Sequence, residues 1–259
     1  MMVSRPIEFP ETVLVTGAAG AVGSKLCEAL VAHGVLAVAT DRREPPLFPA
    51  TESEGVTWIQ ADLEQSEDRH RLVDRMHSLS SGSLGIVHNA SFVGSTELDG
   101  WVGPLESQSS ETWNRALEVS LTAAFTVTRD LSKRLREFPG SAIVHLSSIY
   151  SSLAPDWSLY EGTTMGNPAA YGVAKAGVEQ LTRWLATSLA PNVRVNAVSP
   201  GGIKRDQPQE FIDRYTAKVP LGRMGSEMDV LDTVLFLLSS QSAYITGQTI
   251  VVDGGYSIQ

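Results

Sequence analysis

Short apolar runs rich in β-branched residues recur along this chain, and segments long enough for a helix separate them. Runs of this kind are typical of buried parallel strands. Strands are expected at 12–17, 35–41, 56–62, 84–90, 141–148, 193–201 and 249–255. Helices are expected at 21–33, 66–79, 111–138, 168–190 and 227–240. This alternation predicts an α/β fold, a doubly wound parallel sheet of seven strands.

Length and composition narrow the class of protein further. The 259 residues suit a single domain over 1–259, and a net charge of −9 without a basic run disfavours nucleic acid and anionic membranes as partners. The one cysteine, Cys27, excludes an internal disulfide and any cysteine-built metal site, and we expect no metal. We find neither a signal peptide nor an apolar run of about 18 residues, which predicts a cytoplasmic protein.

Three segments lack a clear helical or strand pattern. Residues 91–110 and 149–167 each follow a predicted strand, at the edge of the sheet where ligands bind in such folds. Residues 201–226 form a third candidate lid.

The first predicted strand leads into the helix through a glycine turn, "VTGAAGAVG" (15–23). Gly17 permits the tight turn, Gly20 lets the backbone approach a pyrophosphate, and Gly23 lets the helix pack on the sheet. Val22 stands in the same turn, at the helix start whose N–H groups attract phosphate. The motif predicts a Rossmann-type dinucleotide site.

The second predicted strand ends at Asp41, 18 residues after Gly23. A carboxylate there accepts hydrogen bonds from ribose hydroxyls and repels a 2′-phosphate, which favours NAD over NADP. Arg42 and Arg43 follow and either meet that phosphate or face solvent, so NADP stays the less favoured alternative.

A tyrosine and a lysine four residues apart follow the segment 149–167. Asn167 is expected as the N-cap and Pro168 as the first helical residue, which sets Tyr171 and Lys175 on one helix face. An ammonium beside the phenol favours the phenolate, so the pair can exchange a proton with a substrate oxygen. Ser148, at the end of the fifth predicted strand, can hydrogen-bond the same oxygen.

From Thr12 to Tyr256 the chain resembles the short-chain dehydrogenase/reductase family, in its compact branch. The motifs that carry the resemblance are "HNAS" (88–91), "DL" (62–63), "VSPGGI" (198–203), "PLGRMG" and "YITGQTIVVDGG". The resemblance implies Tyr171 as acid/base, Lys175 as the group that lowers its pKa and binds the nicotinamide ribose, and Ser148 as the substrate-positioning residue. Further implied cofactor-binding residues are Asp62, Leu63, Asn89, Ala90, Gly201 and Ile203.

Four features depart from the compact branch. Ser120 stands where the family has an asparagine that helps seat a water of the proton relay, and Arg205 stands where threonine is frequent. The spacing G-x-x-G-x-x-G is that of the extended branch, whose members often act on nucleotide sugars. The separation of 23 residues between Ser148 and Tyr171 is longer than compact members have.

The extra residues before Tyr171 suggest a substrate class. Trp157 and Tyr160 can stack on a sugar face, and Glu161 can bind hydroxyls, whereas the alternative is a surface loop with tucked-in aromatic rings. We therefore expect an NAD-dependent oxidoreductase that interconverts a secondary alcohol and a ketone on a sugar or other polyhydroxylated small molecule. A sugar epimerase or dehydratase with internally recycled NAD and a non-catalytic NAD-binding regulator are the alternatives.

By the same resemblance, a homotetramer or homodimer is expected. The helices over 111–138 and 168–190 carry apolar positions that can join a four-helix interface. These positions are Leu121, Phe125, Val178, Leu181 and Leu185.

Overall fold

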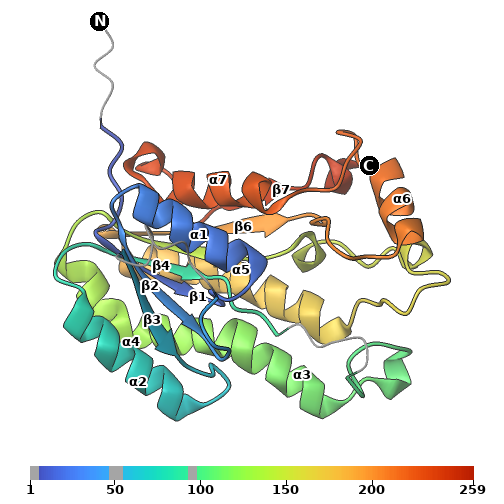
Figure 1. Cartoon of the computed structure of the whole chain (residues 1–259), viewed down its shortest axis with the longest axis horizontal. Helices are drawn as coiled ribbons and strands as arrows, with labels where there is room; N and C mark the ends of the chain where they lie inside the picture. Colours follow the sequence, from blue (N-terminus) through green and yellow to red (C-terminus); the bar gives the residue numbers. More distant parts are fainter. Residues whose placement is uncertain (1–5, 47–54, 93–97) are drawn as a thin grey trace, which may run out of the picture.

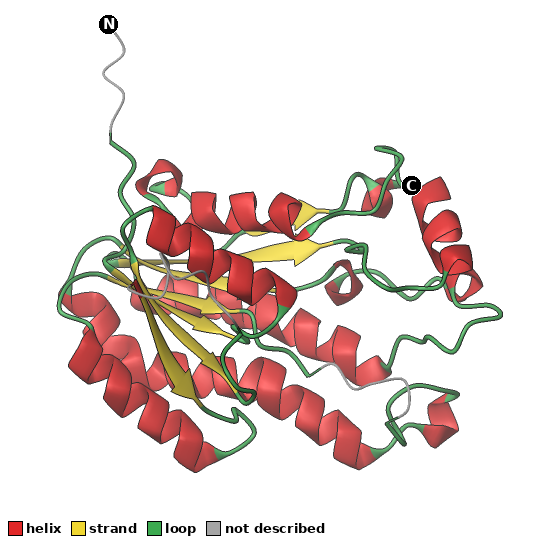
Figure 2. Cartoon of the chain, in the orientation of Figure 1, coloured by secondary structure: helices red, strands yellow, loops and turns green. Residues whose placement is uncertain are grey.

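The computed structural model describes residues 6–46, 55–92 and 98–259, which form one layered α/β unit. Its sheet has seven parallel strands in the order β3-β2-β1-β4-β5-β6-β7, which confirms the predicted fold class. Figure 2 shows the strands between two layers of helices. The strands are β1 Thr12–Thr16, β2 Leu36–Asp41, β3 Val56–Gln60, β4 Leu84–His88, β5 Ser141–Leu146, β6 Val193–Pro200 and β7 Thr249–Val252.

Helices cover both faces of the sheet (Figure 1). Helices α1 (Ala21–Ala32) and α7 (Glu227–Leu238) pack together on one face, and α2 (Ser66–Leu79), α4 (Ala123–Glu137) and α5 (Ala169–Leu189) cover the other. Helix α3 (Ser110–Leu117) precedes α4, and α6 (Gln209–Ala217) lies beyond the end of β6 in Figure 1. Short 3-10 turns occur at Leu105–Ser107, Ile149–Ser151, Trp157–Leu159, Ser240–Ser242 and Tyr256–Ile258.

The apolar strands are explained by burial on both faces. Val13 and Val15 of β1 point into the core beneath α1 and α7, whereas Leu14 between them points into the core beneath α2, α4 and α5. Successive side chains of a strand alternate between faces, so a strand covered on both sides needs an unbroken apolar run. The carboxyl ends of all strands meet at one edge, where the loops assemble.

Two predicted segments differ from the structure. The helix expected over 111–138 is interrupted by a π-helical turn, Glu118–Thr122, between α3 and α4. The candidate lid 201–226 contains α6, whose Phe211 and Tyr215 lie one turn apart and are both buried against the segment 149–167. That apolar pair, at helical spacing, is the signal that the sequence analysis did not use.

The start of α5 is also shifted. Pro168 occupies the N-cap position with extended backbone, so the assignment of Asn167 as N-cap was wrong by one residue. The Asn167 side chain is buried and hydrogen-bonds the Tyr160 phenol instead. A proline cannot donate a backbone hydrogen bond, which is why it is tolerated at this helix end.

The five apolar positions proposed for a subunit interface differ in burial, and two of them, Leu121 and Leu181, are partly buried. Val178 and Leu185 are buried in the core of the chain itself, so their assignment to an interface was wrong. Phe125 is exposed on α4, and Val173 and Trp184 are exposed on α5. The homotetramer or homodimer stays a prediction, with these three residues as its candidates. Among the described helices, none has the length and apolarity needed to cross a membrane.

Candidate active site

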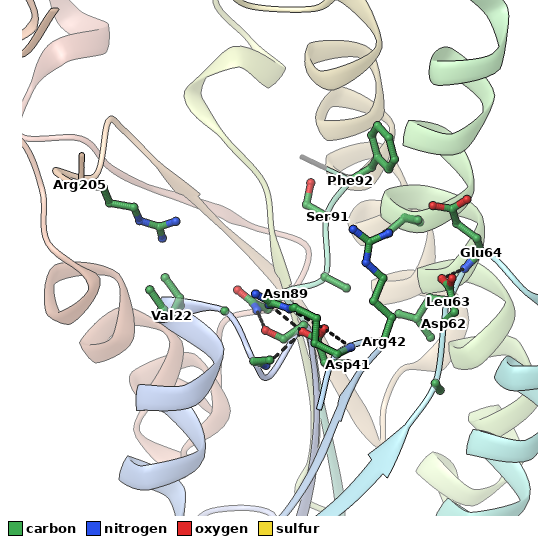
Figure 3. A pocket seen from close by; sticks show the side chains of 18 residues that line it. Val22, Asp41, Arg42, Asp62, Leu63, Glu64, Asn89, Ser91, Phe92 and Arg205 are labelled. Carbon is green, nitrogen blue, oxygen red and sulfur yellow. Dashed lines mark hydrogen bonds and ion pairs between the residues drawn. The ribbon is translucent and has the colours of Figure 1, made fainter. Parts of the chain in front are cut away.

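A groove of about 500 Å³ opens at the carboxyl ends of β1, β2 and β4 (Figure 3). Most of the residues predicted to bind the cofactor line it together. These are Gly17, Gly20, Val22, Asp41, Asp62, Leu63, Asn89 and Ala90. Gly23 lies behind the turn, and Gly201 and Ile203 border a neighbouring cavity of about 440 Å³.

The glycine turn is held against the end of β4. A Cβ atom on Gly17, whose φ is +67°, would come within 2.8 Å of the Ala90 Cα atom. A Cβ atom on Gly23 would come within 2.4 Å of the Gly17 carbonyl oxygen, so α1 can approach the sheet only through a glycine. The Asn89 side-chain amide donates to the carbonyl oxygens of Thr16 and Gly17, both at 3.0 Å.

The residues of this groove fit a dinucleotide. Helix α1 begins at the turn without a side-chain cap, and its first N–H groups are therefore available to a phosphate. Among the described residues other than its two chain neighbours, only the Gly17 carbonyl and the end of Arg43 lie within 4 Å of a Cβ position on Gly20, so the backbone there is open to a ligand. Asp41 stands in the same groove at the end of β2.

Asp41 is the acceptor in a dense hydrogen-bond network. Arg43 donates to it from Nε at 3.0 Å and from Nη2 at 3.1 Å, and the Arg43 and Ala19 backbone N–H groups donate at 3.0 and 3.1 Å. Burial raises the pKa of Asp41, but the hydrogen bonds from Arg43 and Ala19 outweigh it, so the pKa lies below its usual value. The sequence analysis had placed Arg43 opposite a phosphate or in solvent; the structure pairs it with the carboxylate.

The far wall of the groove contains residues that the sequence analysis missed. Phe92 and Val119 line it, and the Arg115 guanidinium lies 4.8 Å from the Phe92 ring centroid. The Ser120 hydroxyl accepts from the Phe92 backbone N–H at 3.3 Å, which ties the π-helical turn to the segment after β4. Such turns are rare and frequently occur at functional sites. Ser91, which Ser120 also contacts at 3.3 Å, directly precedes Phe92.

Tyr171 and Ser148 meet beside this groove. Helix α5 presents Tyr171, and Ser148 follows β5 with extended backbone. Burial raises the pKa of the Tyr171 phenol, while a hydrogen bond with Ser148 and the charge of Arg205 lower it. The expectation that Lys175 sets a lowered pKa is not met in this arrangement, because burial dominates.

Lys175 is almost completely buried one turn beyond Tyr171. Its ammonium donates to the Leu146 carbonyl oxygen at 2.6 Å and lies 5.8 Å from the Tyr171 ring centroid. Burial lowers the pKa of Lys175 to about 8. The lysine therefore lies beside the Tyr171 ring, and its ammonium is held by the backbone at the end of β5.

The segment 149–167 is docked on α6. Lys218 pairs with Asp156, and Arg214 donates to the Glu161 carbonyl oxygen. The Tyr160 ring packs against Phe211 at 5.5 Å between centroids.

The residues proposed to touch substrate in this segment differ in exposure. Tyr160 is partly buried, and its hydroxyl forms a hydrogen bond with the Tyr150 hydroxyl at 2.9 Å. Trp157 is 59% exposed, and the Glu161 side chain is exposed as well.

Known proteins resemble the chain over nearly its whole length. The model of the family described as enoyl-(acyl carrier protein) reductase matches residues 17–257. Post-translational flagellin modification protein A of Campylobacter coli is 29% identical over 95% of this chain and 98% of its own length. Cyclopentanol dehydrogenase of Comamonas testosteroni is 28% identical over 95% of this chain and 97% of its own length. A short-chain dehydrogenase from Leptospira borgpetersenii, solved with bound NAD+, is 30% identical with a TM-score of 0.83, over 96% of this chain and 93% of that chain.

The glycine turn gives a first testable prediction, with Gly34 as a matched control. Both Gly17 and Gly34 have positive φ, but nothing lies within 4 Å of a Cβ position on Gly34. Gly34→Ala is expected to cost about 1 to 2 kcal/mol of unfolding free energy from backbone strain alone. Gly17→Ala is expected to cost about 2 kcal/mol more, because its Cβ meets the Ala90 backbone. Urea unfolding measures both, and equal losses in the two variants would contradict the close approach.

Proposed function

Since the chain belongs to the short-chain dehydrogenase/reductase family, we propose that it is an NAD-dependent oxidoreductase that interconverts a secondary alcohol and a ketone at the Tyr171 hydroxyl. Membership makes the chain an enzyme of this class, an alcohol or carbonyl oxidoreductase that uses a nicotinamide dinucleotide. The observation that carries the finer proposal is the meeting of Ser148 and the partly buried Tyr171 beside Phe92, which lines the groove, with Lys175 one turn away.

The proposed roles follow from the chemistry of these side chains. When bound, the nicotinamide ring supplies the hydride acceptor for oxidation and the hydride donor for reduction. In oxidation the Tyr171 phenolate takes the proton of the substrate hydroxyl, and in reduction the phenol gives that proton to the carbonyl oxygen. Ser148 donates a hydrogen bond to the same substrate oxygen and orients it. Below its pKa of about 8, the buried Lys175 ammonium holds a positive charge near the Tyr171 ring.

The raised pKa of Tyr171 predicts the pH dependence. The neutral phenol dominates at neutral pH, so the phenolate population rises about tenfold per pH unit below the pKa. We expect kcat/KM for alcohol oxidation at saturating cofactor to rise with pH, and kcat/KM for ketone reduction to stay flat near neutral pH. Because Ser148 lowers the pKa of the phenol, Ser148→Ala should move the rise to higher pH. Tyr171→Phe should lower kcat by about a hundredfold or more.

These measurements also separate the competing functions. Net NADH formation with an alcohol substrate is expected for a dehydrogenase. Product formation without net NADH would favour the epimerase or dehydratase. Full biological activity of the Tyr171→Phe variant would remove the catalytic proposals and leave an NAD-binding regulator.

Asp41 supports NAD as the preferred cofactor. Its carboxylate faces the groove at the end of β2, and the Leptospira borgpetersenii relative was solved with NAD+. The bidentate pairing with Arg43 favours NADP instead. A ribose that binds Asp41 would free the Arg43 guanidinium, which can bind a 2′-phosphate.

This arrangement predicts the effect of each partner on cofactor choice. The wild-type protein should have the higher kcat/KM with NAD. Asp41→Asn should reduce the preference for NAD about tenfold, and Arg43→Ala should weaken use of NADP by a similar factor. Arg129 offers a matched control, because it makes the same bidentate pair with Asp130 on the surface of α4. A wild-type preference for NADP, or an equal effect of Arg129→Ala, would contradict the assignment.

The segment 149–167 supports a polyhydroxylated substrate such as a sugar or sugar acid. It follows Ser148 directly, and Tyr160 lies close enough to Tyr171 to influence the pKa of that phenol. Trp157 and Glu161 extend from the same segment with exposed side chains, available to a bound ring and its hydroxyls.

Two classes of substrate test this assignment. Trp157→Ala and Glu161→Ala should each lower kcat/KM for a sugar or sugar-acid substrate about tenfold, from one lost stacking contact or charged hydrogen bond. The same variants should leave kcat/KM for a plain cyclic alcohol such as cyclopentanol unchanged. Tyr244→Ala, an exposed aromatic before β7, is the control. Unchanged kcat/KM for the sugar in both variants would remove the role of this segment.

A further inference from the structure

Arg205 extends a guanidinium into the edge of the groove, where the family resemblance gives threonine. It lines the same groove as Gly17, Gly20 and Val22, although it comes from the loop after β6. In Figure 3 its side chain reaches from that loop toward the end of α1 at which Val22 lies. About half of the side chain is exposed, so the guanidinium is available to a ligand.

Two side chains hold Arg205 in this position. Glu227, at the start of α7, lies 3.5 Å from the Arg205 Nε atom and 3.7 Å from the Lys25 Nζ atom. Lys25 is on α1, one turn beyond Val22, so Glu227 keeps the guanidinium close to the first turns of that helix. Gln207 accepts from the Arg205 backbone N–H at 2.6 Å and donates to the Ile203 carbonyl oxygen at 2.8 Å, which fixes the loop.

The charges in the groove leave a role for this cation. A pyrophosphate carries two negative charges, whereas a helix N-terminus contributes about half an elementary charge. Among the described residues that line the groove, the basic ones are Arg42, Arg43 and Arg205. Arg43 is paired with Asp41, and Arg42 follows Asp41 at the end of β2. Of these three arginines, Arg205 is the one that lies on the loop after β6. The chain as a whole has a net charge of −9.

We propose that Arg205 is a cofactor-binding residue whose guanidinium closes over the pyrophosphate opposite the glycine turn, with Glu227 as its positioning residue. The inference rests on the proposed dinucleotide site. Arg205 also lowers the pKa of Tyr171, so the cation that lines the groove acts on the phenol proposed as acid/base as well. A guanidinium can bind a phosphate oxygen in bidentate geometry, which a threonine hydroxyl cannot.

Binding measurements without turnover test this role. Dissociation constants for NADH, ADP-ribose and adenosine would be measured by calorimetry on the wild type, Arg205→Ala, Arg205→Lys and Lys204→Ala. Lys204 is the adjacent exposed cation and serves as the matched control. Arg205→Ala should weaken NADH and ADP-ribose about tenfold, the loss of one charge-assisted hydrogen bond, and leave adenosine unchanged. Arg205→Lys should recover part of the affinity, and Lys204→Ala should match the wild type.

The salt dependence gives a second readout. The ratio of the Arg205→Ala and wild-type dissociation constants for ADP-ribose should shrink as ionic strength rises from about 0.05 to about 0.5 M, because the guanidinium is half-exposed and screened. Equal NADH affinity in the wild type and Arg205→Ala, or an equal loss of NADH affinity in Lys204→Ala, would overturn the proposed role of Arg205. Failure of the wild type to bind either NADH or NADPH would instead overturn the proposed function.

Discussion

The contact between the ends of β1 and β4 determines the geometry of the rest of the site. The Thr16 hydroxyl accepts hydrogen bonds from the backbone N–H groups of Asn89 and Ala90, at 3.1 and 3.0 Å. The Asn89 side-chain amide donates to the carbonyl oxygens of Thr16 and Gly17. These bonds bring Gly17 so close to Ala90 that no side chain fits between them. The direction in which α1 leaves the sheet, and hence the floor of the groove, follows from this approach.

The parts of the molecule that depend on local sequence were predictable. Each strand is an apolar run because it is buried on both faces, and all seven were located within one to three residues at either end. The glycine turn was predictable because its three glycines lie within one short motif between a strand and a helix, although the atoms that exclude a side chain at Gly17 belong to the distant Ala90. Asp41 was located because a strand end fixes its place relative to that turn.

The parts that depend on contacts between distant segments were not predictable. The π-helical turn at Glu118–Thr122 is joined through Ser120 to the segment after β4. The hydrophobic periodicity of residues 111–138 does not predict this turn. Val178 and Leu185 have the sequence pattern of interface residues, but both are buried within the fold of the chain. The pKa of Tyr171 is raised by burial of the phenol, which outweighs the hydrogen bond from Ser148 and the charge of Arg205, and the sequence does not show how deeply the phenol is buried.

The two halves of the site therefore rest on different interactions. The half proposed for the cofactor has a floor of backbone groups and glycines, whose packing is fixed by sterics, and charged side chains such as Asp41 and Arg43 line it. The half proposed for the substrate is built from side chains that join the segment 149–167 to α6, through Lys218 with Asp156 and the ring of Tyr160 on Phe211. Arg205 belongs to both parts of the proposed site, because it lines the groove and its charge lowers the pKa of the Tyr171 phenol. If Arg205 binds the pyrophosphate as proposed, a single cation would couple cofactor binding to the acidity of the Tyr171 phenol.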